Sequence, residues 1–514
     1  MRRRLALRLT AGLTIAAVLV LVVVLATTAS SGDLGDPPSG PAVTVTVASG
    51  PGGPPIRAGY LGLSLEFQAV RAYTGTDARQ INPVLVQLIR NLTPGQPPVL
   101  RIGGDSTDLS YVPAPGIAPS PFAAYALTPS WMATTGALAR QLGARLIMGL
   151  NLAADRPRLA AAEVEAYARA FGPRSVAALE IGNEPNVYGK IRLFHTKTGR
   201  SLRARPKDYG FREFRRQFRA IAAVAPGTLA GPALALGPTA GAGSWVQQMS
   251  SLLGGEPRMR IMTVHRYPLR NCYVPPSSPQ YPTIDHLLSS YATVGLAESL
   301  HRWVMFAHRE RRRLRVDELN SVACRGKRGV SDAFASSLWA VDALFELARL
   351  GVDGVNLHTL PNSAYQLFEF SRADGRWRAH VKPVYYGLQL FAQAAPPGSR
   401  LLSVSEPSSA AGLSVWATRA RDGRVRVVLI NKSQLTRAIT LRIPRGTETG
   451  ATVSRLTAPS AGAQGAVTLG GRTYGAETYT GALKAPMLAP LREHNGSFTV
   501  TVPRASAALL TFGG

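Results

Sequence analysis

The stretch "VAALEIGNEP", residues 176 to 185, runs from apolar residues into an Asn-Glu-Pro sequence. A short apolar run that ends in a turn signal is typical of a buried β-strand. Pro185 restrains the chain as it leaves the strand, so Glu184 stands at the strand's carboxyl end. Taken alone, the pattern fits a catalytic acid and a turn-capping carboxylate about equally well.

Seven further apolar runs of this kind surround the first: residues 61–67, 98–105, 145–152, 228–234, 260–268, 314–321 and 353–360. Between them lie segments whose apolar residues recur at spacings of three and four, which predicts amphipathic helices. Examples are residues 77–92, 128–143, 158–172 and 331–351. Eight alternating strand and helix units predict a (β/α)8 TIM barrel over residues 56–396, an α/β fold.

The helical spacing stops near residue 399, where short alternating strands with Gly, Asn and Pro turns begin. Turns every ~8 to 12 residues are typical of an all-β sandwich, predicted here over residues 397–514. Near the other end of the chain, "AVTVTVASG" predicts a strand that stops at the turn-rich "PGGPP". We expect residues 42–55 to add this strand to the sandwich.

The first residues, "MRRRLALRLT", are basic and lead into an uncharged apolar run of nearly the ~20 residues that cross a bilayer. Residues 1–31 therefore read either as a signal peptide or as an amino-terminal membrane anchor, and both alternatives stay open. Residues 32–41 are a Pro/Gly linker. The rest of the chain is expected to be exported, either secreted or held at the outer face of the membrane.

The formal charge of +28 first suggests a nucleic-acid partner. Only 7 of the 58 basic residues are Lys, and the Arg residues are scattered rather than gathered in one patch, which argues against that partner. Two explanations remain: a general Arg bias of the source proteome, or an acidic partner such as an anionic polysaccharide.

Two predicted strands end in candidate catalytic carboxylates, Glu184 on the fourth strand and Glu318, within "VDELNS", on the seventh. Glycosidic bond cleavage uses two carboxyl groups, one to protonate the leaving oxygen and one to attack carbon or activate water. Active-site residues of TIM barrels lie at the carboxyl ends of strands, so the pair is harder to explain as two unrelated caps. The other strand ends are polar too: Glu66, Asp105, Asn151, Asn183, His265, Tyr267 and His358.

Several longer motifs resemble one family. They are "GLSLEF", "LRIGGDSTD", "LEIGNEPN", "HRYP", "ELNSVACRG", the segment from Gly329 to His358, "VKPVYYGLQLFA" and, in the predicted sandwich, "GGRTYGAETYTG". Over residues 42–514 the chain resembles family 79 of the glycoside hydrolases, the β-glucuronidases and heparanases, within the clan A retaining glycosidases.

This resemblance implies Glu184 as general acid and base and Glu318 as the nucleophile. Asn183 would bind the sugar 2-hydroxyl, and Tyr267 would orient the nucleophile. The remaining positions implied to contact the sugar are Glu66, Asp105 and Tyr365. The double-displacement chemistry needs neither a cofactor nor a metal, and the implied partner is a glycoside or an acidic polysaccharide.

One departure concerns the loop after Glu318. Family members that bind a uronate have a tyrosine five residues after the nucleophile, followed by glycines, whereas this chain has Ala323, Cys324, Arg325 and Gly326. The missing tyrosine puts glucuronide preference in question, and Arg325 offers another way to hold a carboxylate. Because export exposes the chain to an oxidising compartment and adjacent strands would bring the two loops together, Cys272 is expected to form a disulfide with Cys324.

The leading hypothesis is a retaining exo-acting β-glycosidase for β-glucuronides or related β-linked glycosides. One alternative within the same family is a β-glucosidase type of specificity. The alternative from another class is a non-catalytic exported carbohydrate-binding or surface protein on a glycosidase-like scaffold. The presence of both carboxylates favours the enzyme.

Overall fold

The computed structural model describes residues 37–40, 42–172, 174–192, 194–195, 199–237, 241–405, 410–444 and 450–513. The predicted export segment, residues 1–31, lies outside this part of the chain. Among the described helices, none has the length and apolar character that a membrane crossing requires.

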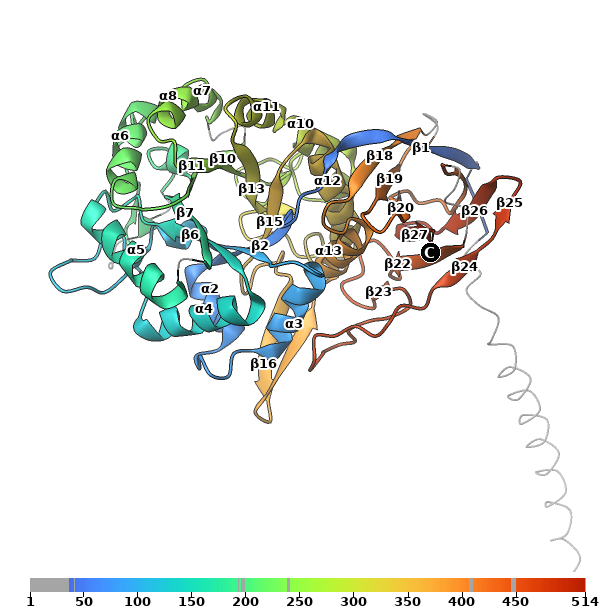
Figure 1. Ribbon diagram of the computed structural model, residues 1–514, viewed down its shortest axis with the longest axis horizontal. Coiled ribbons are helices and arrows are strands. Elements are labelled where there is room, and N and C mark those ends of the chain that lie inside the picture. The colour runs from blue at the N-terminus through green and yellow to red at the C-terminus, as the bar shows by residue number, and fades with distance from the viewer. Residues whose placement is uncertain are drawn as a thin grey trace, which may run out of the picture.

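Eight parallel strands close into a barrel, with the strand–helix alternation that the sequence predicts (Figure 1). The fold prediction is therefore confirmed. Each of the eight apolar runs forms one barrel strand. In ring order these are β2 (Leu61–Glu66), β3 (Val99–Gly103), β6 (Arg145–Leu150), β7 (Val176–Ile181), β10 (Leu229–Leu236), β11 (Met259–Arg266), β13 (Arg313–Leu319) and β15 (Gly354–Thr359).

Helices surround the barrel, and their starts follow local capping chemistry. Asn82 accepts hydrogen bonds from two backbone N–H groups at the start of α3, and Thr128 accepts one at the start of α4. Each cap is followed by a proline in the first turn, where a missing N–H costs nothing. The helices are α2 (Phe67–Thr74), α3 (Pro83–Leu92), α4 (Pro129–Leu142), α5 (Pro157–Phe171), α6 (Phe211–Ala222), α7 (Gly243–Val246), α8 (Met249–Gly254), α9 (Ile284–Leu288), α10 (Val294–Glu298), α11 (His301–Arg309), α12 (Ala335–Leu350) and α13 (Pro383–Ala394).

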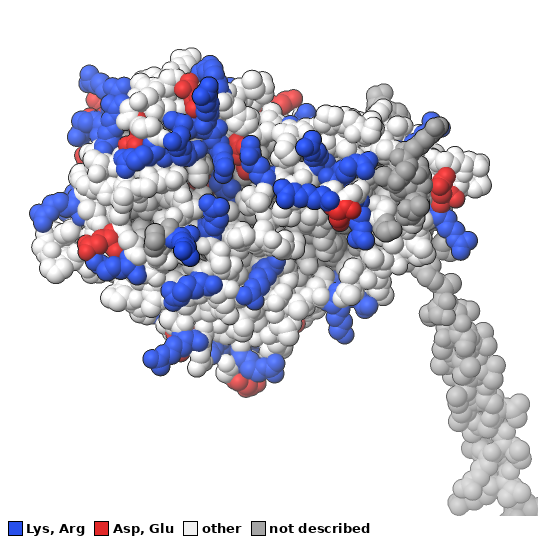
Figure 2. All heavy atoms as spheres, viewed as in Figure 1, with Lys and Arg blue, Asp and Glu red and all other residues white. Residues whose placement is uncertain are grey.

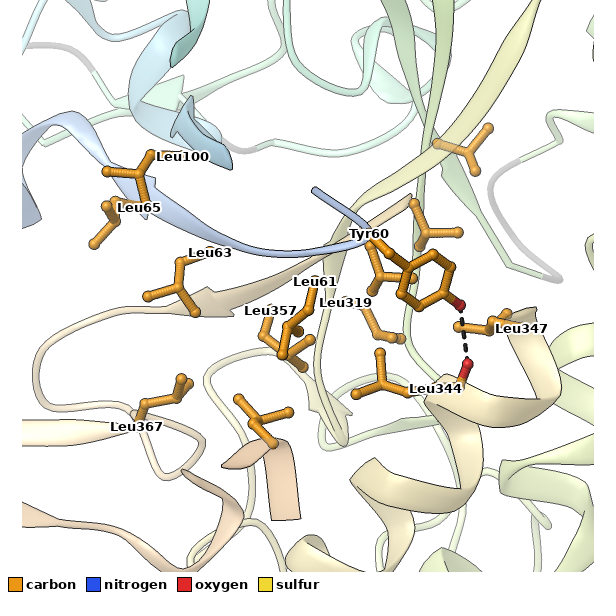
Figure 3. Packing of buried hydrophobic residues seen from close by; sticks show 14 of the residues in the cluster. Tyr60, Leu61, Leu63, Leu65, Leu100, Leu319, Leu344, Leu347, Leu357 and Leu367 are labelled. Atoms are coloured by element: carbon orange, nitrogen blue, oxygen red, sulfur yellow. Dashed lines mark hydrogen bonds between the residues drawn. The ribbon is translucent and has the colours of Figure 1, made fainter. Parts of the chain in front are cut away.

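Alternation along β2 divides its side chains between two environments. Leu61, Leu63 and Leu65 belong to the apolar cluster that packs the barrel against its helices, shown in Figure 3. Just before the strand, the Tyr60 hydroxyl donates a hydrogen bond to the Leu344 carbonyl of α12 at 2.9 Å. Ser64 lies on the opposite face of β2 and contacts Arg101 inside the barrel at 3.2 Å.

The barrel interior is polar, which the apolar runs did not predict. Arg315 is buried there and donates to the Gly59 carbonyl at 3.1 Å, and Asn356 Nδ2 donates to the Leu63 carbonyl at 2.8 Å. A β-carbon added at Gly62 would lie 2.4 Å from the Val99 carbonyl oxygen, so only glycine fits at that point. Polar groups therefore support the floor of the site from below.

The C-terminal strands form one eleven-stranded sheet that also contains β1 (Val43–Pro55). Although β26 is separated from β20 and β27 by several strands in the strand order, it contacts both of them and β24, so the sheet folds over a second apolar cluster. The other strands are β18 (Arg400–Ser405), β19 (Leu413–Arg419), β20 (Val425–Asn431), β21 (Arg437–Arg442), β22 (Ala451–Thr457), β23 (Thr468–Leu469), β24 (Ala489–Leu491), β25 (Glu493–His494), β26 (Ser497–Val502) and β27 (Ser506–Phe512).

The prediction of a turn at "PGGPP" is wrong, because β1 continues through these residues to Pro55. The strand pairs with β18 on one side and β21 on the other, and its register against β18 shifts twice, after Val47 and after Pro51. Prolines are tolerated in a strand at such irregular points, where the regular ladder is already interrupted. Residues 43 to 55 thus connect the start of the described chain to its C-terminal sheet.

Candidate active site

Glu184 stands directly after β7, in a left-handed backbone conformation with φ of 50°. Its backbone N–H donates to the Ala233 carbonyl at 2.9 Å, which fixes this unusual turn against the neighbouring strand. Its carboxylate Oε1 lies 3.0 Å from His265 Nδ1, and the side chain keeps about a fifth of its surface exposed. Strain of this kind persists where surrounding contacts hold it, and it is common in functional sites.

Glu318 stands at the end of β13 and is more enclosed. Arg101 Nη1 donates to Glu318 Oε2 at 2.8 Å, and the Tyr267 hydroxyl donates to Glu318 Oε1 at 3.0 Å. Burial by itself raises the pKa of Glu318, but the charges of His358, His265 and Arg101 outweigh it and hold that pKa well below its usual value. Glu318 is therefore a carboxylate at neutral pH.

The two glutamates meet across His265. One oxygen of Glu184, one nitrogen of His265 and one oxygen of Glu318 all lie within 4.8 Å of one another. These three atoms are close enough to share a cation, but the Arg101 guanidinium already supplies a positive charge at Glu318 Oε2. The prediction that the chemistry needs no metal stays a prediction.

Asn183 and Asp105 lie together beside Glu184. Asn183 Nδ2 donates to Asp105 Oδ1 at 3.2 Å, and Asn183 Oδ1 accepts from Arg101 Nη2 at 3.0 Å. Asp105 is exposed at the mouth, yet desolvation by the surrounding groups and then the carboxylates of Glu66, Glu184 and Glu318 raise its pKa. Asp105 thus places a carboxyl group that can hold a proton next to the side-chain amide of Asn183.

Glu66 is held mainly by its own neighbours. Its carboxylate accepts hydrogen bonds from the Asp105 N–H at 3.1 Å, from the Ser106 N–H at 2.8 Å and from the Ser106 hydroxyl. His358 Nε2 lies 3.6 Å from Glu66 Oε1. Glu66 therefore fixes the turn that carries Asp105, in addition to lying at the floor of the site.

Tyr365 lies on the opposite wall, in the loop after β15. Its ring centroid is 6.2 Å from that of Tyr267 and 5.8 Å from that of His358. Burial first, and then the negative charge of Glu318, raise the pKa of Tyr365 well above its usual value, so its hydroxyl keeps its proton. A neutral phenol at this place can donate a hydrogen bond.

A disulfide joins Cys272 to Cys324, as predicted, with the Cα atoms 6.1 Å apart. It links the loops after β11 and β13, which also pair through the short strands β12 (Leu269–Arg270) and β14 (Val322–Ala323). Cys324 and Arg325 both have positive φ, of 62° and 67°. The crosslink therefore constrains the loop that carries Arg325.

Sequence reasoning missed the residue at the centre of the site, Arg101 of β3. The side chain is fully buried and donates to Glu180 Oε2 at 2.8 Å as well as to Glu318 and Asn183, and it lies 3.2 Å from His265 Nε2. Its signal was present in "VLRIGG", because charged residues are almost never fully buried unless they are paired. An arginine within an apolar strand thus pointed to buried carboxylates elsewhere.

Those carboxylates include a second pair, Glu180 and Asp317, beneath the glutamates of the mouth. Both side chains are fully buried and in contact with each other. Among the described residues, no group donates a hydrogen bond of normal geometry to either oxygen of Asp317 or to Oε1 of Glu180. Burial and then the charge of Glu180 raise the pKa of Asp317 well above its usual value. Burial opposes ionisation of Glu180 too, but Arg101 and the contact with Asp317 lower its pKa. The two acids therefore share one proton.

This shared proton predicts a pH dependence of stability. The folded pKa of Asp317 lies above the unfolded value of ~3.9, so above that pH the folded state binds more protons, and stability falls as pH rises. Asp317→Asn removes the effect while keeping a donor toward Glu180. Between pH 5 and 7 we expect the free energy of unfolding of the wild type to fall relative to Asp317→Asn, with a slope of at most about 1.4 kcal/mol per pH unit, the limit for one proton.

The measurement is the thermal unfolding midpoint of both proteins across that pH range. The control is Asp374→Asn, because Asp374 is exposed in a hairpin turn with φ of 49°, a conformation that Asn tolerates. Its midpoint should follow the wild type at every pH. Parallel curves for wild type and Asp317→Asn would show that the pair carries no extra proton.

Comparison with known families matches residues 415–509 to the glycosyl hydrolase family 79 C-terminal beta domain. This confirms the predicted resemblance to family 79 through the C-terminal part of the chain. No curated protein sequence is similar enough to this chain to count as a match.

Solved structures extend the likeness to the whole fold. The chain is similar to a 4-O-α-L-rhamnosyl-β-D-glucuronidase from Fusarium oxysporum 12S, with 18% identity, a TM-score of 0.71 and coverage of 91% of this chain and 100% of that one. A GH51 arabinofuranosidase from Xanthomonas axonopodis pv. citri has 15% identity, a TM-score of 0.66 and coverage of 92% and 99%. An α-L-arabinofuranosidase from Thermotoga maritima has 15% identity, a TM-score of 0.62 and coverage of 91% and 99%.

At these identities the solved structures establish the fold alone. The fold is that of barrel glycosidases with a β domain, and the matched domain carries a family 79 signature. Together these findings support a glycoside hydrolase.

Proposed function

We propose that this chain, with its family 79 C-terminal domain, is a retaining β-glycosidase that uses Glu184 as acid and base and Glu318 as nucleophile. The observation that carries the proposal is the approach of one oxygen of each carboxylate to within 4.8 Å of the other. Retaining enzymes hold their two carboxyl groups ~5 to 5.5 Å apart, whereas inverting enzymes need ~6.5 to 9.5 Å to admit a water.

In the first step, Glu184 gives its proton to the glycosidic oxygen as Glu318 Oε1 or Oε2 attacks the anomeric carbon. The bond to the leaving group breaks, and an ester between the sugar and Glu318 forms. Arg101 and Tyr267 hold the two oxygens of Glu318 at 2.8 and 3.0 Å, which orients the attacking group. The low pKa of Glu318 keeps it ionised for this attack.

In the second step, Glu184 is a carboxylate and takes a proton from water as the water attacks the anomeric carbon. The ester to Glu318 breaks, and the sugar leaves with its original configuration. His265 Nδ1 lies 3.0 Å from Glu184 Oε1, and His265 Nε2 lies 3.2 Å from Arg101 Nη2, so the ring is held between the two. His265 therefore orients Glu184 in both steps.

For the sugar, we propose that Asn183 and Asp105 bind hydroxyl groups and that Tyr365 donates to the substituent at the far side of the ring. Of the two acids Asp105 and Glu66, Asp105 is the better placed to bind a sugar hydroxyl, because it is exposed at the mouth. Glu66 already accepts three hydrogen bonds from its own turn, so its contribution is chiefly to hold Asp105.

For the substrate class, we propose a β-glucuronide whose carboxylate is held by Arg325. The Arg325 guanidinium is exposed, and among the described residues its one protein partner is the Pro361 carbonyl at 3.4 Å. Its backbone carbonyl accepts from the Ala364 N–H at 2.8 Å, next to Tyr365. A guanidinium with free donors beside a neutral tyrosine suits a planar carboxylate.

The test is a panel of chromogenic β-glucuronide, β-glucoside, β-galactoside and β-xyloside. We expect release from the glucuronide, and Arg325→Ala should lower its kcat/KM by about 10- to 100-fold, since a charge-assisted hydrogen bond contributes ~1.5 to 3 kcal/mol. The control is Arg328→Ala, an exposed arginine of the same loop, which should leave kcat/KM within twofold.

The outcomes separate the alternatives. Preferential cleavage of the glucoside, unaffected by Arg325→Ala, would support a β-glucosidase specificity on the same machinery. Binding of glycosides with no release from any of the four would support the carbohydrate-binding protein and contradict the enzyme.

A further inference from the structure

A cavity of about 600 Å³ lies on the outer side of the catalytic strand β11, separate from the mouth of the barrel. It opens between the ends of β10 and β11 and the helices α7 and α11. Its volume falls within the ~300 to 1,000 Å³ of ligand pockets. The polar side chains that line it are Ser244, Arg266, Ser299 and Arg302.

The end of β11 serves two sites because side chains alternate along a strand. His265 and Tyr267 face the catalytic glutamates, at 3.0 Å from Glu184 and Glu318 respectively. Arg266, between them, points the other way and lines the cavity. The two sites are thus back to back across one strand.

Arg266 is only 8% exposed, yet its hydrogen-bond partners are neutral. Nε donates to the Ser299 hydroxyl at 3.0 Å, and Nη1 donates to the Tyr267 carbonyl. Burial lowers the pKa of Arg266, which the Tyr291 hydroxyl only partly offsets. Buried charges are normally paired, so a buried guanidinium without a carboxylate is an exception that calls for a ligand.

Arg302, at the start of α11, lines the same cavity and is exposed. No Asp or Glu lines this cavity among the described residues, and neither arginine has a carboxylate within ion-pair distance there. Figure 2 shows that Lys and Arg outnumber Asp and Glu on the visible surface over α6, α7 and α8. The local charge therefore favours an anion.

We propose that this cavity is a binding site for an oxyanion, a sulfate, phosphate or carboxylate group, held between the Arg266 and Arg302 guanidinium groups. Arginine presents parallel N–H donors that match such groups. Ser244 and Ser299 add hydroxyl groups within the same cavity. The site does not depend on the glycosidase chemistry, because none of its side chains belongs to the proposed catalytic machinery.

The test measures the thermal unfolding midpoint of the full chain with increasing sodium sulfate, sodium phosphate or sodium acetate, each against sodium chloride at equal ionic strength. A ligand that binds only the folded state raises the midpoint with saturation. We expect a saturable rise of about 2 to 5 °C with at least one of the three oxyanions in the wild type. The anion that gives the strongest response identifies the group.

Two variants decide whether the response comes from this cavity. Arg302→Ala and Arg302→Glu should abolish the saturable rise, and both should fold because the side chain is exposed. The matched controls are Arg309→Ala and Arg309→Glu, since Arg309 lies on the same helix, is 69% exposed and stacks on Phe306 away from the cavity. Equal responses from both pairs of variants, or no saturation in the wild type, would overturn the proposal.

Discussion

Glu318→Gln is expected to lower glycoside hydrolysis by about 10⁴-fold or more, the size of effect seen when a covalent nucleophile is removed. Glutamine has nearly the same shape but lacks the negative charge that attacks the anomeric carbon. The measurement is kcat for an aryl β-glycoside from the panel above. The folded state should persist, because the amide oxygen can accept from Arg101 while the amide NH2 donates to the Tyr267 hydroxyl, which can also accept.

The control for this loss is Glu346→Gln. Glu346 is also a largely buried glutamate with an arginine partner, Arg349 at 2.7 Å, but it lies on α12 outside the site. Its kcat should stay within twofold of the wild type. If Glu318→Gln retained more than about a tenth of wild-type kcat, Glu318 would not be the nucleophile.

Azide then separates the two roles. In Glu318→Ala, azide can take the place of the nucleophile on an activated aryl β-glycoside, and one displacement gives an α-glycosyl azide. In Glu184→Ala, the glycosyl-enzyme still forms, and attack by azide gives a β-glycosyl azide. Swapped products would reverse the assignment of Glu184 and Glu318.

Arg101→Met should have the largest effect on stability. The side chain is fully buried and pairs with Glu180 and Glu318 at 2.8 Å each, with Asp317 at 3.8 Å. Methionine fills similar space but leaves buried carboxylates without a counter-charge, which costs about 3 to 5 kcal/mol. We expect the thermal unfolding midpoint to fall by about 3 to 7 °C. Hydrolysis should also fall by about 100-fold or more, because Glu318 loses its orienting donor.

The matched control is Arg349→Met. Arg349 also pairs with a glutamate, but about half of its side chain is exposed, and exposed pairs contribute ~0 to 1 kcal/mol. Arg101→Lys should recover part of the midpoint but less of the activity, since one ammonium cannot reach the partners that a guanidinium spans. A midpoint for Arg101→Met within about 1 °C of the wild type would refute this account of the network.

How much of the site was predictable differs from residue to residue. Glu184 and Glu318 were found because each ends an apolar run, and the order of runs puts them on the fourth and seventh strands. The partners of Arg101 were not found, because they lie 79 and 217 positions away and meet only when the barrel closes. The continuation of β1 through "PGGPP" was also missed, since turn residues are tolerated in a strand only where neighbours allow a bulge.

The amino-acid sequence by itself determined the eight strand and helix units, the β-rich C-terminal part and the two glutamates at strand ends, because the period of apolar residues and the turn signals are local properties of the chain. The tertiary structure alone decided the state of those glutamates. Closure of the barrel brings Arg101, His265 and His358 to Glu318 and keeps it ionised, and it forces Glu180 and Asp317 to share a proton. Charge interactions depend on distance in space and on burial, and neither quantity is written in the order of the residues.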